Sequence, residues 1–114
     1  MNIKELIVAM KIRPQMFVFP VRVDYIYYYL MGFAASQNRN NPDDVDLAFK
    51  NDFYHWAYNW IIKNKDSQYE LNAAFWYHMF QDVTKEENEA VELFFKLSEE
   101  FFGKFHYDEQ NKNN

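Results

Sequence analysis

The fold is decided by residues 84–102, which read TKEENEAVELFFKLSEEFF. Thr84 and Glu87 stand at the spacing of a capping box, which predicts that a helix begins there. On a helical wheel, the apolar residues that follow cover an arc of about 200°. They are Ala90, Val91, Leu93, Phe94, Phe95, Leu97, Phe101 and Phe102. So wide an arc has to be covered on two sides, and we therefore predict a long C-terminal helix at the centre of the core.

Both ends of the chain carry boundary signals. Gly103 is expected to end or bend the C-terminal helix, and residues 107–114, which have no pattern, are predicted to be a disordered tail. At the other end, Asn2 and Glu5 have capping-box spacing, and they open an apolar stripe that Pro14 closes. That stripe consists of Ile3, Leu6, Ile7 and Met10.

The segment after the first helix is less regular. Residues 15–20 are expected to be extended. Apolar and polar residues alternate over 21–25, which allows a strand, but we favour a helix over 24–37 that Asp24 would cap. One face of that helix would carry Ile26, Tyr29, Leu30 and Phe33. Whether residues 17–25 are helix, strand or extended is left open.

The middle of the chain predicts further helices separated by turn residues. Residues 38–44 form a loop of Asn, Asp, Arg and Pro, and a short helical turn over 45–49 follows it. The clearest stripe comes next, with Phe53, Trp56, Ala57, Trp60 and Ile61. Residues 64–67 interrupt it, and a further helix is marked by Tyr69, Ala73, Trp76 and Phe80. The whole pattern predicts one all-α domain over residues 1–106, a single compact bundle of about five helices.

Composition agrees with this fold class and excludes several kinds of site. Aromatic residues make up 21% of the chain, whereas two glycines and three prolines are too few for the turns of a sandwich or barrel. Cysteine is absent, which excludes disulfides, thiolate metal sites and cysteine nucleophiles. The near-apolar run at 25–35 is too short to span a bilayer, and the one at 6–10 is too short for a signal peptide. We therefore expect a soluble, cytoplasmic protein.

Charge is unevenly distributed along the chain. The net charge is −5. Residues 1–50 carry six basic and five acidic residues, whereas residues 51–114 carry six basic and twelve acidic ones. Because nucleic acids select clusters of Lys and Arg, we expect no direct binding to DNA or RNA.

Residues that could carry catalysis are few. His55, His78 and His106 are far apart in the sequence, and neither a zinc motif nor a glycine-rich phosphate loop is present. His78 and Asp82 stand four residues apart on a predicted helix, so an acid–base dyad is geometrically possible. The alternative, which we favour, is a histidine that meets a capping carboxylate near the end of the helix. We predict that the protein is not an enzyme and has no catalytic residue, metal or cofactor.

Two acidic patches and two tyrosines are the candidate binding residues. The first patch is Asp43, Asp44 and Asp46 at the loop, and the second is Asp82, Glu86, Glu89, Glu92 and Glu99. Tyr27 and Tyr28 belong to a run of tyrosines that cannot all be buried on one helix face. Carboxylates on a rigid helix can occupy the phosphate-binding cations of a basic protein, and tyrosine is enriched in binding hot spots. The alternative for the acidic face is a role in solubility alone.

Several short motifs occur in a recognisable order. They are Arg13-Pro14-x-Met16-Phe17, Leu30-Met31-Gly32-Phe33, Phe53-x-x-Trp56, the aromatic-centred stretch over 72–80, and Glu89-Ala90-x-Glu92-Leu93-Phe94-Phe95-x-Leu97-x-x-Glu100-Phe101. Together they resemble the small helical immunity proteins of bacterial polymorphic and contact-dependent growth-inhibition toxin systems. The resemblance implies a cytoplasmic inhibitor that binds one toxin domain, often a nuclease, and blocks its active site. It implies no catalytic residues.

Three hypotheses follow for the function. The first is an immunity protein, monomeric or weakly dimeric when free, that neutralises a cognate toxin domain by covering its active or substrate-binding site with an acidic, aromatic-bearing surface. The second is a non-enzymatic adaptor or scaffold that self-associates through exposed aromatic residues. The third is a small enzyme or ligand carrier with an aromatic pocket, for which His78 is the candidate residue.

Overall fold

Every regular element in the described part of the protein is a helix. The computed structural model describes residues 1–37, 43–71 and 75–112, with side chains through Lys104. The elements in these ranges are α1 (Ile3–Ile12), η1 (Pro14–Met16, a 3₁₀ helix), α2 (Val23–Ala35), α3 (Asp44–Asn64), α4 (Tyr77–Asp82) and α5 (Glu87–Lys112). The Cα radius of gyration of 14.3 Å is near the value of about 13 Å typical of a compact domain of this size. The predicted all-α fold with a long C-terminal helix is confirmed.

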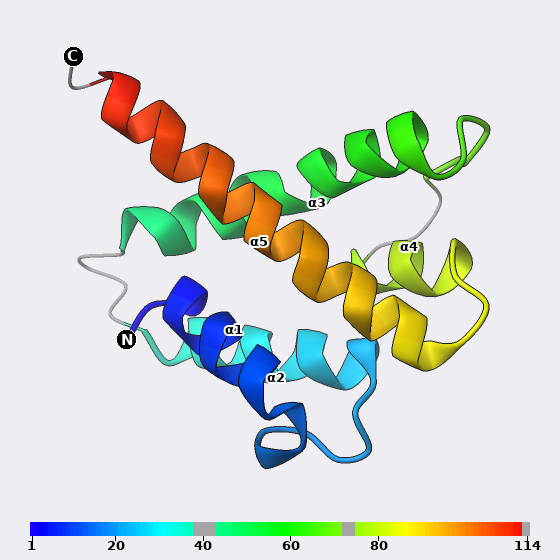
Figure 1. The fold of residues 1–114 in the computed structure, drawn as a ribbon. Coiled ribbons are helices and arrows are strands. Elements are labelled where there is room, and N and C mark those ends of the chain that lie inside the picture. Colours follow the sequence, from blue (N-terminus) through cyan, green and yellow to red (C-terminus); the bar gives the residue numbers. More distant parts are fainter. Residues whose placement is uncertain (38–42, 72–74, 113–114) are drawn as a thin grey trace.

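Helix α5 is the centre of the core. It crosses the molecule diagonally and packs against α1, α2, α3 and α4 (Figure 1). All eight apolar residues of the predicted arc are buried, with exposed fractions of 7% or less. The Phe94 ring stacks on Trp76 at a centroid distance of 4.9 Å, and it meets Phe53 of α3 edge-on at 6.0 Å. Aromatic contact from two sides is what the wide apolar arc requires.

Helix α5 begins at Glu87, two residues later than a cap at Thr84 predicts, and the predicted capping box is not formed. Thr84 donates its hydroxyl hydrogen to the Phe80 carbonyl oxygen at 2.6 Å. The carboxylate of Glu87 accepts a hydrogen bond from the backbone N–H of Val23 instead of from residue 84. Thr84 thus bonds back to α4 and Glu87 has a tertiary partner, so neither side chain makes the contact that a capping box requires.

The other end of α5 differs from the expectation at Gly103. The helix continues through this glycine to Lys112, so the alternative in which Gly103 ends it is wrong. Extending a helix that is already nucleated costs little, and the packed turns before Gly103 provide that nucleus. The backbone of residues 107–112 is part of this helix, and the division of the chain into a domain over 1–106 and a tail over 107–114 stays a prediction.

Helix α1 has the predicted boundaries. The side chain of Asn2 accepts the N–H of Glu5 at 2.9 Å, and the Glu5 carboxylate accepts the N–H of Asn2 at 3.1 Å, so this capping box is formed. The helix ends at Ile12, before Pro14. Residues 15–20 do not form a purely extended segment, because the 3₁₀ helix η1 begins at Pro14 and includes Met16. The fixed φ angle of proline suits the first position of a helix.

Helix α2 confirms the preference for a helix over a strand, with one correction. Its N-cap residue is Arg22, whose backbone is extended, and not Asp24. Asp24 lies in the first turn, where it accepts a hydrogen bond from the Arg22 guanidinium at 3.0 Å. Ile26 and Leu30 are fully buried as expected, whereas Tyr29 is 40% exposed.

Helix α3 joins two segments that we predicted as separate. The turn over 45–49 and the stripe that begins at Phe53 belong to one helix, which starts after Asp43 and ends at Asn64. Phe53, Ala57 and Ile61 of the stripe are fully buried. Of the loop predicted over 38–44, residues 38–42 lie outside the described residues.

The helix predicted to begin at Tyr69 is shorter than expected. Helix α4 covers only Tyr77–Asp82, and Tyr69 lies in an irregular segment that follows α3. In that segment the carboxylate of Asp66 accepts the N–H of Gln68, a local bond that favours a turn over a helix. Ala73 lies outside the described residues. Trp76 and Phe80 are buried as predicted.

Candidate functional site

The loop aspartates are largely engaged in holding helix ends. Asp43 is the N-cap of α3, and its side chain accepts the N–H of Val45 at 2.8 Å. Asp46 accepts the N–H of Ile3 at 2.7 Å, so it caps the first turn of α1 from a distant part of the chain. Asp44 is exposed, and no hydrogen bond or ion pair occupies its carboxylate among the described residues. As a binding patch, this group therefore offers one unoccupied carboxylate.

Helix α5 presents a row of exposed carboxylates on the side opposite its buried arc. We call this row the α5 acidic face. It consists of Glu86, which directly precedes the helix, and of Glu89, Glu92, Glu99 and Glu100, all exposed. From Glu89 to Glu99 it extends about 15 Å at the α-helical rise of 1.5 Å per residue. Glu100 had not been included among the candidates, although it lies eleven residues after Glu89 and hence in nearly the same direction on the wheel.

Partners within the protein reduce the charge of this face only in part. The Lys11 ammonium forms an ion pair with Glu99 at 2.7 Å, and Glu89 accepts the backbone N–H of Lys85 at 3.1 Å. Lys96 lies in the middle of the face, but its ammonium sits over the Trp60 ring at 5.1 Å and does not pair with Glu92. The carboxylates of Glu86 and Glu92 take part in no hydrogen bond or ion pair within the described part of the chain.

Asp82 and His78 do not form a dyad. Asp82 accepts a hydrogen bond from the hydroxyl of Tyr69 at 2.9 Å, and burial, together with this bond, raises the pKa of the Tyr69 phenol. The His78 ring lies 4.2 Å from the Tyr77 ring, centroid to centroid, and 6.4 Å from Phe75. His78 is thus part of an aromatic cluster, and neither the dyad nor the capping contact that we favoured is formed.

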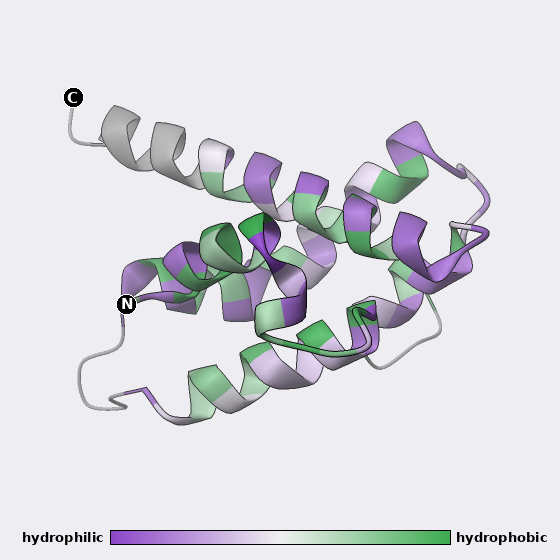
Figure 2. Ribbon diagram, turned by 60° about the horizontal axis from the view of Figure 1, so that its bottom comes forward, coloured by the Kyte–Doolittle hydropathy of each residue, from purple (hydrophilic) through white to green (hydrophobic). Residues whose placement is uncertain are grey.

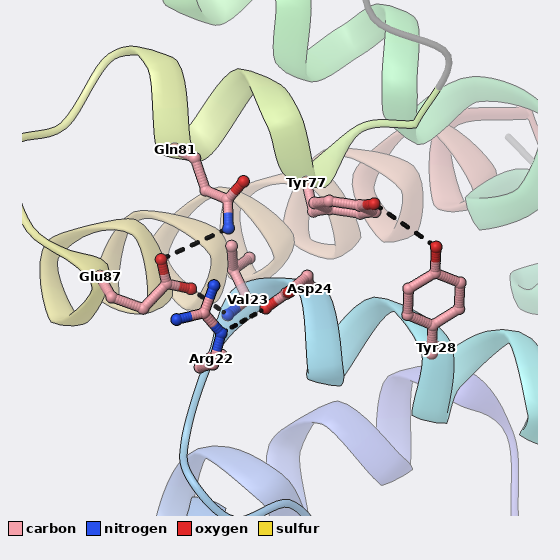
Figure 3. Close-up of polar contacts among 7 residues, drawn as sticks. All are labelled: Arg22, Val23, Asp24, Tyr28, Tyr77, Gln81 and Glu87. Atoms are coloured by element: carbon pink, nitrogen blue, oxygen red, sulfur yellow. Dashed lines mark hydrogen bonds and ion pairs between the residues drawn. The ribbon is translucent and has the colours of Figure 1, made fainter.

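The two candidate tyrosines lie on α2 in different environments. Tyr27 is half-buried, and its ring centroid lies 5.0–5.2 Å from those of Tyr28, Phe75, Trp76 and Tyr77. Burial raises the pKa of Tyr27. Tyr28 is 57% exposed, and its hydroxyl lies 3.4 Å from that of Tyr77 (Figure 3). This hydrogen bond, with burial, raises the pKa of Tyr77 to about 12. The phenols of Tyr27 and Tyr77 are therefore protonated at neutral pH.

A polar contact that we did not predict joins α2 to α4 and α5. The side chain of Arg22, the N-cap residue of α2, accepts no hydrogen bond from the first turn of the helix. Instead Glu87 accepts the N–H of Val23 at 2.7 Å and is approached by the Gln81 amide at 3.4 Å (Figure 3). Glu87 is 64 residues from Val23 in the sequence, so no local pattern could predict this contact.

An aromatic cleft between α2 and α3 was also missed. Its volume is about 150 Å³, and it opens next to the segment that leads into α4. Phe49 and Trp76, which are 3% and 5% exposed, form its buried part. Tyr27 and Phe75 line its outer part, and Lys50 is the charged residue at its edge. The signal was present in the sequence only as an excess of aromatic residues, because the lining comes from three separate segments.

Comparisons of the chain with protein-family models, with curated proteins and with solved structures find no match. None of the helices in residues 1–37, 43–71 and 75–112 is both long enough and apolar enough to cross a membrane. In the same ranges, no three His, Asp or Glu side chains are grouped as a metal ion would require.

Proposed function

We propose that this protein is an immunity protein that neutralises a basic toxin domain, and that it docks through the α5 acidic face. The observation that carries the proposal is a row of exposed carboxylates on a helix whose opposite side is the core of the protein. Such a helix is held rigidly, so its carboxylates need little ordering when they bind. Lysines and arginines that bind phosphate groups in a nuclease are complementary to such a row.

The mechanism is occlusion of the toxin. The carboxylates of Glu92 and Glu86, which pair with no group of the described residues, contact the cations of the substrate-binding site, while Tyr28 adds an exposed aromatic anchor. Long-range attraction between the acidic face and a basic domain accelerates association. The compartment that fits this role is the cytoplasm, where the toxin would act.

The first experiment uses the neighbouring gene. The C-terminal domain of the protein encoded immediately upstream is expressed with and without this chain, while cell growth and the integrity of RNA and DNA are followed. We expect the domain to kill alone, this chain to rescue growth, and the degraded nucleic acid to identify the target. A harmless domain, or killing that this chain does not prevent, would overturn the proposal.

A second experiment tests the α5 acidic face. Glu92→Lys should slow association with the toxin by about three- to tenfold at low salt, and raising the salt concentration should reduce the difference. Asp52→Lys, an exposed change on α3, is the matched control with the same change in net charge. Equal effects of the two variants would leave immunity possible but remove the α5 acidic face from its mechanism.

A second candidate function is a self-associating adaptor or scaffold. It is favoured by apolar side chains around the connection between α1 and α2, a largely hydrophobic stretch in Figure 2. Ile12, Met16 and Phe19 are 75%, 70% and 84% exposed. A second copy of the chain could cover them. Sedimentation that is independent of protein concentration would argue against this candidate, and a dimer that Phe19→Ser dissociates would support it.

A further inference from the structure

The aromatic cleft between α2 and α3 has a volume comparable to that needed by a single ring. Its volume of about 150 Å³ matches that of an engineered apolar cavity in another protein that binds benzene. The buried rings of Phe49 and Trp76 meet at right angles in its deep part, with their centroids 6.2 Å apart. The cleft is mostly apolar, because these two rings and the rings of Tyr27 and Phe75 line it.

The walls favour an aromatic guest over an aliphatic one. The Tyr27 ring stands edge-on to Trp76 at 5.0 Å and tilted toward Phe75 at 5.2 Å, so the wall of the cleft is built from aromatic rings in several orientations. Aromatic pairs gain from edge-to-face and offset contacts beyond the area that they bury. Met31 of α2 adds a thioether, which makes favourable contacts with aromatic rings.

A cation stands at the edge of this cleft. Lys50 is exposed, and within the described residues its ammonium takes part in no hydrogen bond or ion pair. An unpaired ammonium beside an apolar cleft attracts a ligand that carries a negative charge next to its ring. Lys50 would repel a ligand that carries a guanidinium group. A ligand with a neutral ring alone would leave the Lys50 ammonium without an ion pair.

We propose that the cleft is a binding site for a small aromatic carboxylate, whose ring contacts Phe49 and Trp76 while its carboxylate pairs with Lys50. The ligand class follows from the size of the cleft, the rings that line it and the charge at its edge. This site is independent of the proposed toxin partner, because it uses none of the glutamates of the α5 acidic face.

The test uses the full chain labelled with 5-fluorotryptophan and the probes phenylacetate and 2-phenylethanol. Trp56, Trp60 and Trp76 give three fluorine NMR signals, which single Trp→Phe variants assign. We expect both probes to shift the Trp76 signal selectively, with dissociation constants on the order of 1 mM. Phenylacetate should bind about two- to fivefold more tightly than its neutral analogue at low salt, the range of an exposed ion pair.

Two variants of exposed lysines on α3 test the role of the cation. Lys50→Gln should abolish the preference for phenylacetate, whereas Lys63→Gln, the matched control, should keep it. The proposal is overturned by no shift of the Trp76 signal at about 20 mM of either probe, or by equal shifts of all three signals. It is equally overturned by a preference for phenylacetate that survives Lys50→Gln.

Discussion

Replacing Glu87 with alanine removes the acceptor that caps helix α2 from another part of the fold. The Glu87 carboxylate accepts the N–H of Val23 at 2.7 Å. Val23 is fully buried, and the N-cap residue Arg22 provides no side-chain acceptor for this helix end. In the variant, the N–H of Val23 loses its partner where water has little access, so the cost is that of an unsatisfied buried donor.

The expected loss of unfolding free energy in Glu87→Ala has two contributions. A hydrogen bond to a charged group contributes about 1.5–3 kcal/mol, and a negative charge at a helix N-terminus adds about 0.3–1 kcal/mol. Glu87 is half-buried, so water recovers part of this loss. We expect Glu87→Ala to lower the free energy of unfolding by about 2 kcal/mol, and Glu87→Gln, which keeps an acceptor oxygen, by about 1 kcal/mol.

The assay is urea unfolding followed by circular dichroism at 222 nm. Glu86→Ala is the control, because Glu86 is the exposed neighbour and carries the same charge; its effect should stay within about 0.5 kcal/mol. In the double variant, the losses of unfolding free energy from Thr84→Ala and Glu87→Ala should add, because the two side chains have different partners and form no capping box. A Glu87→Ala effect no larger than the control, or strong coupling to Thr84, would refute this reasoning.

Three further outcomes can be checked by unfolding experiments. Gly32→Ala and Gly103→Ala should each stabilise the protein by about 0.5–1 kcal/mol, because both lie inside helices and an added Cβ meets no atom within 4 Å; a loss of stability would contradict this. Asp46→Ala should cost about 1–2 kcal/mol and Asp44→Ala less than about 0.5 kcal/mol, since only Asp46 caps α1; equal losses would be the contrary result. The pKa of Tyr69 is raised in the folded state, so the stability that Tyr69 contributes is present below its unfolded pKa of 10.0 and falls as the pH rises above that value. In Tyr69→Phe, the urea midpoint should therefore fall less steeply with pH above 10.0. An unchanged slope would contradict this prediction.

Periodicity predicted the parts of the fold in which one helix face is buried. The eight apolar residues of α5 and the centre of the α3 stripe are buried as the pattern indicated. The Asn2–Glu5 capping box and the end of α1 before Pro14 were also predictable, because both depend on neighbours in the sequence. The continuity of α3 was not, since the polar residues 50–52 between the two predicted segments resemble a break when only local preference is considered.

The candidate site was predicted less well, because the role of an acidic residue depends on what lies opposite to it. Asp43, Asp46 and Asp82 are the same type of residue as Asp44, yet three of the four are occupied by bonds to a backbone or a hydroxyl. Glu86, Glu89, Glu92 and Glu99 are exposed as predicted, since a helix that is buried on one side must expose the other, whereas Glu100 of the same face was not predicted.

By itself, the sequence determined the all-helical class, the central position of the C-terminal helix and the exposure of its acidic side, because these follow from the spacing of residues along one helix. Tertiary structure alone decided that Glu87 caps α2, that Asp46 caps α1, and that Phe49, Trp76 and Lys50 meet at one cleft. Those contacts join segments far apart in the chain, and their formation depends on how the helices pack, which no local pattern records.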